Sequence, residues 1–125
     1  MFFDSVSQEL VMEVWHPANA PGASSIRTKL GEGITGWVAQ HRETVLVNDV
    51  TKDKGNRYKR YDEPSNSELC VPIVDQDRLV GVINLESYRK GAFDERDKQM
   101  LEALTDQVVI AIQSVKNREQ LNIHL

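Results

Sequence analysis

The sequence is short of cysteine, and this scarcity excludes several kinds of site. Cys70 is the one cysteine among 125 residues. The chain can therefore form no internal disulfide bond and no zinc site built from four cysteines. A lone thiol fits a reducing compartment, so we expect a cytoplasmic protein.

The sequence also lacks a basic excess and any long apolar run. Its formal net charge is −4 and its pI is near 5.3, which gives no electrostatic footprint for nucleic acid or an anionic membrane. Its apolar runs fall far short of the roughly 20 residues needed to cross a bilayer, and its N-terminus has no basic flank followed by an apolar region. We therefore expect no nucleic-acid partner, no membrane contact and no signal peptide.

What the chain does have is the composition of one globular domain. It contains 40% hydrophobic and 27% charged residues in 14.2 kDa, which is ordinary for a single domain with its own core. We expect one domain over residues 1–125, cut from a longer protein.

The first half of the chain reads as short strands joined by loops. Residues 17–25 hold two prolines and a glycine and predict a loop. Residues 48–66 mix five basic and four acidic residues with two tyrosines, and a surface segment of that length predicts a lid. The other expected elements are a hairpin of 1–3 with 10–16, a strand at 26–30, a short helix at 37–42 and a strand at 44–47.

A second hairpin, 67–74 with 79–87, gives the clearest pattern in the chain. Alternation places Leu69 and Ile83 on an apolar face, and it places Glu68, Cys70 and Asn84 on the opposite one. The opposite face mixes apolar and polar groups, as the floor of a binding pocket does.

From Asp94 the hydrophobic period changes to that of a helix. Asp94 is suited to the N-cap, and the helix should run to about Asn117 or beyond. An almost heptad stripe predicts a dimer seam or a connector. The seam residues are Leu101, Leu104, Val108, Ala111 and Val115.

Several other sequence patterns do not indicate a cofactor or metal site. Gly31–Gly36 matches G-x-G-x-x-G, but the next strand follows too soon for the βαβ unit that binds a dinucleotide. His16, His41 and His124 are scattered, so we expect no metal site. One axial histidine would suffice for haem, and the cofactor is left unknown.

Three segments in this order resemble the GAF domain family. They read GEGITGWVAQHRETVLVNDV, then SELCVPIVDQDRLVGVINLES, then GAFDERDKQMLEALTDQVVIAIQ, and the similarity spans about residues 10 to 113. The resemblance implies an α+β fold of the GAF/PAS kind. In that fold a central antiparallel sheet carries N- and C-terminal helices on one face and a lid-covered ligand pocket on the other. The first helix of that fold is missing here.

The resemblance also implies where a small-molecule ligand would bind. Trp15 would offer a flat apolar wall, while Thr35 and Asn84 would offer hydrogen-bond donors and acceptors. The full set of pocket positions is Trp15, His16, Ile34, Thr35, Tyr58, Cys70 and Asn84.

The family's better-defined ligands match these residues poorly. Cyclic-nucleotide binders share a five-residue signature, of which Phe93 and Asp97 match while Ser87, Tyr88 and Lys98 depart. Bilin binders need a pocket cysteine beside a histidine, and Cys70 has no adjacent histidine.

We expect a non-catalytic sensory module of a signal-transduction protein, such as a two-component system. It would be a homodimer that relays ligand binding through its C-terminal helix to an output domain, namely a histidine kinase, a nucleotide cyclase or a transcription regulator. Two alternatives stay open. One is an enzyme similar to free methionine sulfoxide reductases, although one cysteine cannot form their internal disulfide. The other is a ligand-free dimerisation module.

Overall fold

The structure is a computed structural model that describes residues 1–15, 23–53 and 65–123. Side chains are described for residues 1–12, 26–53 and 65–120. Its expected lid therefore falls largely outside the described residues, apart from the short 3-10 helix η1 (Val50–Lys52).

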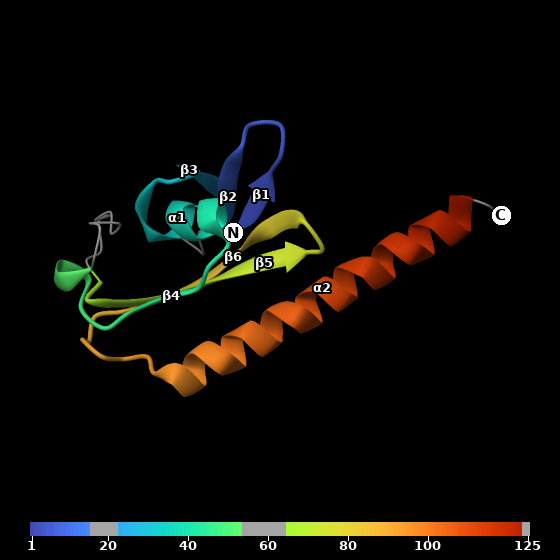
Figure 1. The fold of residues 1–125 in the computed structure, drawn as a ribbon. Helices are drawn as coiled ribbons and strands as arrows, with labels where there is room; N and C mark the ends of the chain where they lie inside the picture. The colour runs from blue at the N-terminus through green and yellow to red at the C-terminus, as the bar shows by residue number, and fades with distance from the viewer. Residues whose placement is uncertain (16–22, 54–64, 124–125) are drawn as a thin grey trace.

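Six strands form one antiparallel sheet in the order β3-β2-β1-β6-β5-β4. The expected α+β class with a central antiparallel sheet is confirmed (Figure 1). The strands are β1 (Phe2–Asp4), β2 (Glu9–Trp15), β3 (Ala23–Lys29), β4 (Val45–Val47), β5 (Ser67–Asp75) and β6 (Arg78–Ser87).

Two helices cover opposite faces of this sheet. Helix α1 (Gly33–His41) lies on one face, and the long helix α2 (Glu95–Ile123) runs across the other, mainly along β5 (Figure 1). We call these the α1 face and the α2 face. Among the described residues, no helix is long and apolar enough to cross a membrane.

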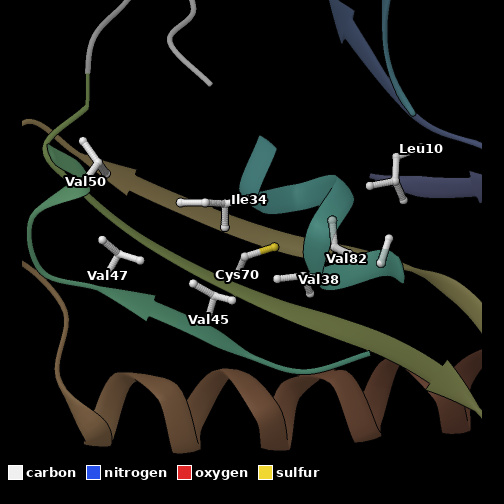
Figure 2. Close-up of a cluster of buried hydrophobic side chains, with 9 residues drawn as sticks. Leu10, Ile34, Val38, Val45, Val47, Val50, Cys70 and Val82 are labelled. Atoms are coloured by element: carbon white, nitrogen blue, oxygen red, sulfur yellow. The ribbon is translucent and has the colours of Figure 1, made fainter. Parts of the chain in front are cut away.

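Each face has its own hydrophobic cluster, because successive strand residues point to opposite sides. On the α1 face, Ile34 and Val38 from α1 pack against Val45, Cys70 and Val82 from three strands (Figure 2). On the α2 face, Leu69 and Val71 of β5 pack against Leu101 of α2, with Leu46, Ile83 and Phe93 around them.

The β5–β6 hairpin confirms the alternation expected from the sequence, with one exception. Leu69 pairs with Leu85 on the α2 face, and Cys70 pairs with Asn84 on the α1 face. The register shifts between Ile73 and Val74, which leaves Val80 as an extra residue. This bulge turns Leu79 to the α1 face, where it packs with the core.

Helix α1 begins four residues before the expected start. The Gly36 N–H already donates to the Glu32 carbonyl, and Ile34 is only 2% exposed. Burial of this first turn outweighs the low helix propensity of its glycines. Gly36 allows the approach, because a Cβ at that position would overlap the backbone oxygen of Lys29.

We predict that Gly36→Ala destabilises the domain by about 3 kcal/mol, because the added methyl group meets backbone atoms that cannot rotate away. Gly91→Ala is the matched control, since Gly91 has a positive φ of 65° but open space around it. It should cost only about 1 kcal/mol of backbone strain. Urea unfolding of both variants measures the difference, and equal losses would contradict the packing explanation.

Candidate functional site

Polar side chains gather on the α1 face where β5 and β6 run side by side. Glu68 lies directly across from Glu86, and Cys70 lies across from Asn84. The Ser65 hydroxyl donates to Glu86 Oε1 over 3.0 Å. We call Ser65, Glu68, Asn84 and Glu86 the polar cluster. Facing strand residues have Cβ atoms about 5 Å apart, so these side chains are neighbours.

Glu68 is the most deeply buried carboxyl group of the cluster, at 3% exposure. Its burial, a hydrogen bond with Glu86, and the negative charges of Glu86 and Asp53 together raise its pKa to about 9. Desolvation is the largest of these effects, because it penalises the charged carboxylate. Glu68 therefore holds a proton at neutral pH while Glu86 accepts hydrogen bonds.

Asn84 supplies a second unusual group to the same face. Its side-chain oxygen Oδ1 is buried and has no hydrogen-bond partner among the described residues. An unsatisfied buried acceptor costs about 1–3 kcal/mol. A ligand that brings an N–H or O–H donor to Asn84 would remove this cost.

Cys70, the one cysteine of the sequence, lies next to the polar cluster on β5, and it is fully buried. Figure 2 shows its side chain pointing from β5 toward α1. Burial, followed by the charge of Glu68, raises the pKa of this thiol above its usual range. In this conformation Cys70 is thus a protonated core residue, and attack on a ligand would require a change that ionises it.

The structure brings together some of the expected pocket residues. Ile34 and Cys70 belong to one buried cluster, Asn84 faces Cys70, and Thr35 is partly buried on α1. His16 and Tyr58 lie outside the described residues, and so does the side chain of Trp15.

Glu68 and Glu86 were missing from the expected site, although the sequence carried a signal for both. Alternation already placed Glu68 on the face of Cys70, and Glu86 on the face of Asn84. What the sequence does not show is that Glu68 is buried, because burial depends on how α1 and the neighbouring strands pack around it.

The expected dimer seam divides between two sides of α2. Leu101 is buried against β5 and Val108 is partly buried, whereas Leu104, Ala111 and Val115 are exposed. This seam stays a prediction.

An open cleft of about 490 Å³ lies on the α2 face, away from the polar cluster. Arg42, Lys98 and Glu102 are among its lining residues. These opposite charges partly neutralise one another, with Lys98 Nζ 4.0 Å from Glu102 Oε1.

Among the described residues, no group of three histidine, cysteine or acidic side chains could hold a metal ion.

Comparison with known proteins identifies a family and a set of relatives. A model of the GAF domain matches residues 2–113. The free methionine-R-sulfoxide reductase of Saccharomyces cerevisiae is 36% identical over 77 residues, which cover 61% of this chain and 42% of that protein. The enzyme of the same name from Escherichia coli is 29% identical over 83 residues, which cover 66% and 49%.

A solved structure of a protein with the same name is also similar to this chain. The free methionine-R-sulfoxide reductase from Neisseria meningitidis, in complex with its substrate, superposes with a TM-score of 0.77 at 27% identity, covering 94% of this chain and 66% of that one. The chain spans about half the length of the curated relatives it matches.

These relatives contradict two expectations from the sequence, namely a non-catalytic domain and a role in signal transduction. The expectation of a non-catalytic domain was wrong, because the similar proteins are named as enzymes. The assignment to signal transduction, as a sensor or a two-component protein, conflicts with the same finding. A single cysteine cannot form the internal disulfide of those enzymes, but the rest of the fold is similar to theirs.

We predict that the domain loses stability as pH rises, because Glu68 ionises near pH 4.5 in the unfolded chain but near pH 9 when folded. Between these values unfolding releases a proton, so the free energy of unfolding falls with rising pH. Urea unfolding at pH 5.5, 7 and 8.5 should show this slope, and Glu68→Gln should flatten it. Asp106→Asn, at an exposed carboxylate, should keep it, and an unchanged slope in Glu68→Gln would refute the assignment.

Proposed function

The chain belongs to the GAF domain family, and on this premise we propose that it acts on free methionine-R-sulfoxide, bound at the polar cluster on the α1 face. Proteins of that name are among its relatives in both sequence and structure. The observation that carries the proposal is a pair of buried groups, the Glu68 carboxyl and the unpartnered Asn84 Oδ1, beside the exposed carboxyl group of Glu86.

A free amino acid brings the group that this cluster lacks. Its ammonium has three N–H donors and one positive charge, and the cluster offers two carboxyl groups and an amide oxygen. A positive charge at this position favours ionised Glu68, so we expect binding to expel the proton that Glu68 holds. An amide-linked methionine carries no such charge and has a single N–H donor, so it cannot satisfy all of these acceptors.

The apolar part of the same face suits the rest of the ligand. Val47 and Val50 border the cluster side of the α1-face core, with Ile34 above Cys70 (Figure 2). A methionine side chain is flexible and mostly apolar, so it packs against such branched aliphatic groups.

Reduction of the sulfoxide would run through Cys70, the only thiol in the chain. In the first step the Cys70 sulfur bonds to the sulfoxide sulfur. The sulfoxide S–O bond and this new S–S bond then break, the oxygen passes to Cys70 and takes up the thiol proton, and methionine leaves as the thioether. The thiol is thereby oxidised to a sulfenic acid and the sulfoxide is reduced. An external thiol then condenses with the sulfenic acid, releasing water and forming a mixed disulfide. A second external thiol restores Cys70. A reaction that uses external thiols suits a reducing compartment such as the cytoplasm.

We predict that isothermal titration calorimetry detects binding of L-methionine-R-sulfoxide to the wild-type chain. Glu68→Gln cannot supply the carboxylate, and Asn84→Ala removes the unpartnered acceptor, so each should weaken binding about tenfold or more. Asp106→Asn is the matched control. The N-acetylated ligand lacks the ammonium and should not bind; equal binding of both ligands would reject the ammonium site.

Proton release gives a second readout of the same site. Titrations in two buffers of different ionisation enthalpy at pH 7.5 should show release of up to one proton on binding, and Glu68→Gln should abolish it. Binding that moves no proton in the wild type would show that Glu68 does not face the ammonium.

We predict that, with dithiothreitol as the external thiol, the wild-type chain converts the sulfoxide to methionine and Cys70→Ser does not. Because the pKa of the Cys70 thiol is raised, the rate should increase with pH above neutrality. Calorimetry on Cys70→Ser is the control, since this variant should still bind the ligand. Wild-type binding without any turnover would overturn the reductase step and leave the binding site intact.

A further inference from the structure

Ser65 reaches the polar cluster although strand alternation would direct it to the other side of the sheet. Ser67 pairs with Ser87 on the α2 face, and in an extended strand residue 65 would share that face. The chain bends at Asn66 instead, and the Ser65 hydroxyl donates to Glu86 Oε1 over 3.0 Å. Ser65 is buried there, at 7% exposure, so a local departure from the strand holds it on the α1 face.

Hydrogen bonds of Asn66 keep this bend in place. Its N–H donates to the Ser87 carbonyl over 2.8 Å, and its carbonyl accepts from the Val50 N–H over 2.9 Å. Its side-chain Nδ2 donates to the Tyr88 carbonyl. The bend is thus tied both to η1 and to the end of β6, so the Ser65 hydroxyl has its place before any ligand arrives.

Glu86 is the member of the polar cluster that most needs such a contact. It is exposed, so some of its rotamers point into solvent. Holding a long, flexible side chain in one rotamer costs conformational entropy. The hydrogen bond from Ser65 offsets this cost and keeps the Glu86 carboxylate beside Glu68, with which it shares a hydrogen bond.

The same contact decides which carboxyl group of the pair holds the proton. A donor that faces a carboxylate favours its ionised form, and the Ser65 hydroxyl faces Glu86. Glu68 is buried and lies near the negative charges of Glu86 and Asp53, which favours its neutral form. With the proton on Glu68, the carboxylate of Glu86 is the negative group that a cation meets first.

We propose that Ser65 is a positioning residue, which holds Glu86 in place as the carboxylate that receives the ammonium of the substrate. This role rests on the proposed function, and Ser65 acts through Glu86 rather than on the substrate itself. Loss of the hydroxyl would release Glu86 toward solvent. The site would then lose a contact to the ammonium, and Glu68 would lose a neighbouring negative charge.

NMR titration of the Glu68 carboxyl carbon in the ligand-free chain tests this role. In Ser65→Ala the midpoint should fall by about 0.5 to 1 pH unit from the wild-type value near 9. Ser65→Thr keeps the hydroxyl and should restore the midpoint. An unchanged midpoint in Ser65→Ala would overturn the proposal.

Ser67→Ala is the matched control for both measurements. The Ser67 hydroxyl is also buried and donates to the Arg89 carbonyl over 2.6 Å, so this variant loses a comparable hydrogen bond without touching Glu86. Its Glu68 midpoint should stay at the wild-type value. An equal fall in Ser65→Ala and Ser67→Ala would assign Ser65 a purely structural role and overturn the proposal.

Calorimetry with L-methionine-R-sulfoxide tests the consequence for the ligand. Ser65→Ala should weaken binding about fivefold or more, whereas Ser67→Ala should bind like the wild type. In a Glu86→Gln background, Ser65→Ala should cause no further loss, because Ser65 acts through the charge of Glu86. Equal weakening in both backgrounds would reject this route.

The two measurements separate this role from the proposed function. The titration needs no ligand, so a wild type that binds no methionine sulfoxide would reject the proposed substrate while the titration still decides whether Ser65 controls the pair. Binding that is lost in Glu68→Gln but unchanged in Ser65→Ala would keep the substrate and reject Ser65 as a positioning residue.

Discussion

The antiparallel pairing of β5 with β6 is the constraint on which both faces of the molecule depend. It sets Glu68 against Glu86 and Cys70 against Asn84 on one side, and Leu69 against Leu85 on the other. Because side chains alternate, a slip of one residue would exchange the two sets. The slip would place a carboxyl group under Leu101 and apolar residues in the polar cluster. The bulge at Val80 lies at the far end of the hairpin, so it redirects Leu79 without disturbing the cluster.

The polar cluster shows a conflict between stability and binding. Burying Glu68 costs desolvation energy, which appears as its pKa of about 9, and Asn84 Oδ1 lacks a partner among the described residues. An apolar pair at these positions would stabilise the fold further. Groups that are poorly satisfied in the free protein are a common feature of binding sites, where the ligand completes the hydrogen bonds. The cost at Glu68 is thus consistent with a cationic ligand and has no structural benefit of its own.

The sequence predicted much of the fold because its signals there are local. Alternation in residues 67–87 indicated the hairpin and its faces, and the helical period after Asp94 indicated α2. The start of α1 was missed because burial of Ile34 is a tertiary effect that overrides glycine propensity. Ile34, Cys70 and Asn84 were expected in the pocket and do lie on one face, whereas Glu68 was not expected there. Its altered ionisation comes from burial and from the charges of Glu86 and Asp53, which are distant in the sequence. The reductase was kept only as an alternative to a non-catalytic domain, because a single cysteine cannot form the internal disulfide of those enzymes.

The same geometry decides what the lone thiol can do. Cys70 shares its face with the polar cluster, so a ligand held by Glu68 and Asn84 would extend toward it; yet Ile34, Val38 and Val45 cover its sulfur (Figure 2). A thiolate there would be an uncompensated buried charge, next to the carboxyl group of Glu68. The proposed ligand would change this balance in two opposing ways, because its ammonium would add a positive charge while the ionisation of Glu68 would add a negative one. Because the two charges oppose one another, the ligand's charge alone would not ionise the thiol, which the core residues of α1 and β4 still cover. Recognition of the proposed substrate and activation of the thiol would therefore be separable, since the first depends on Glu68 and Asn84 and the second on the cover over Cys70.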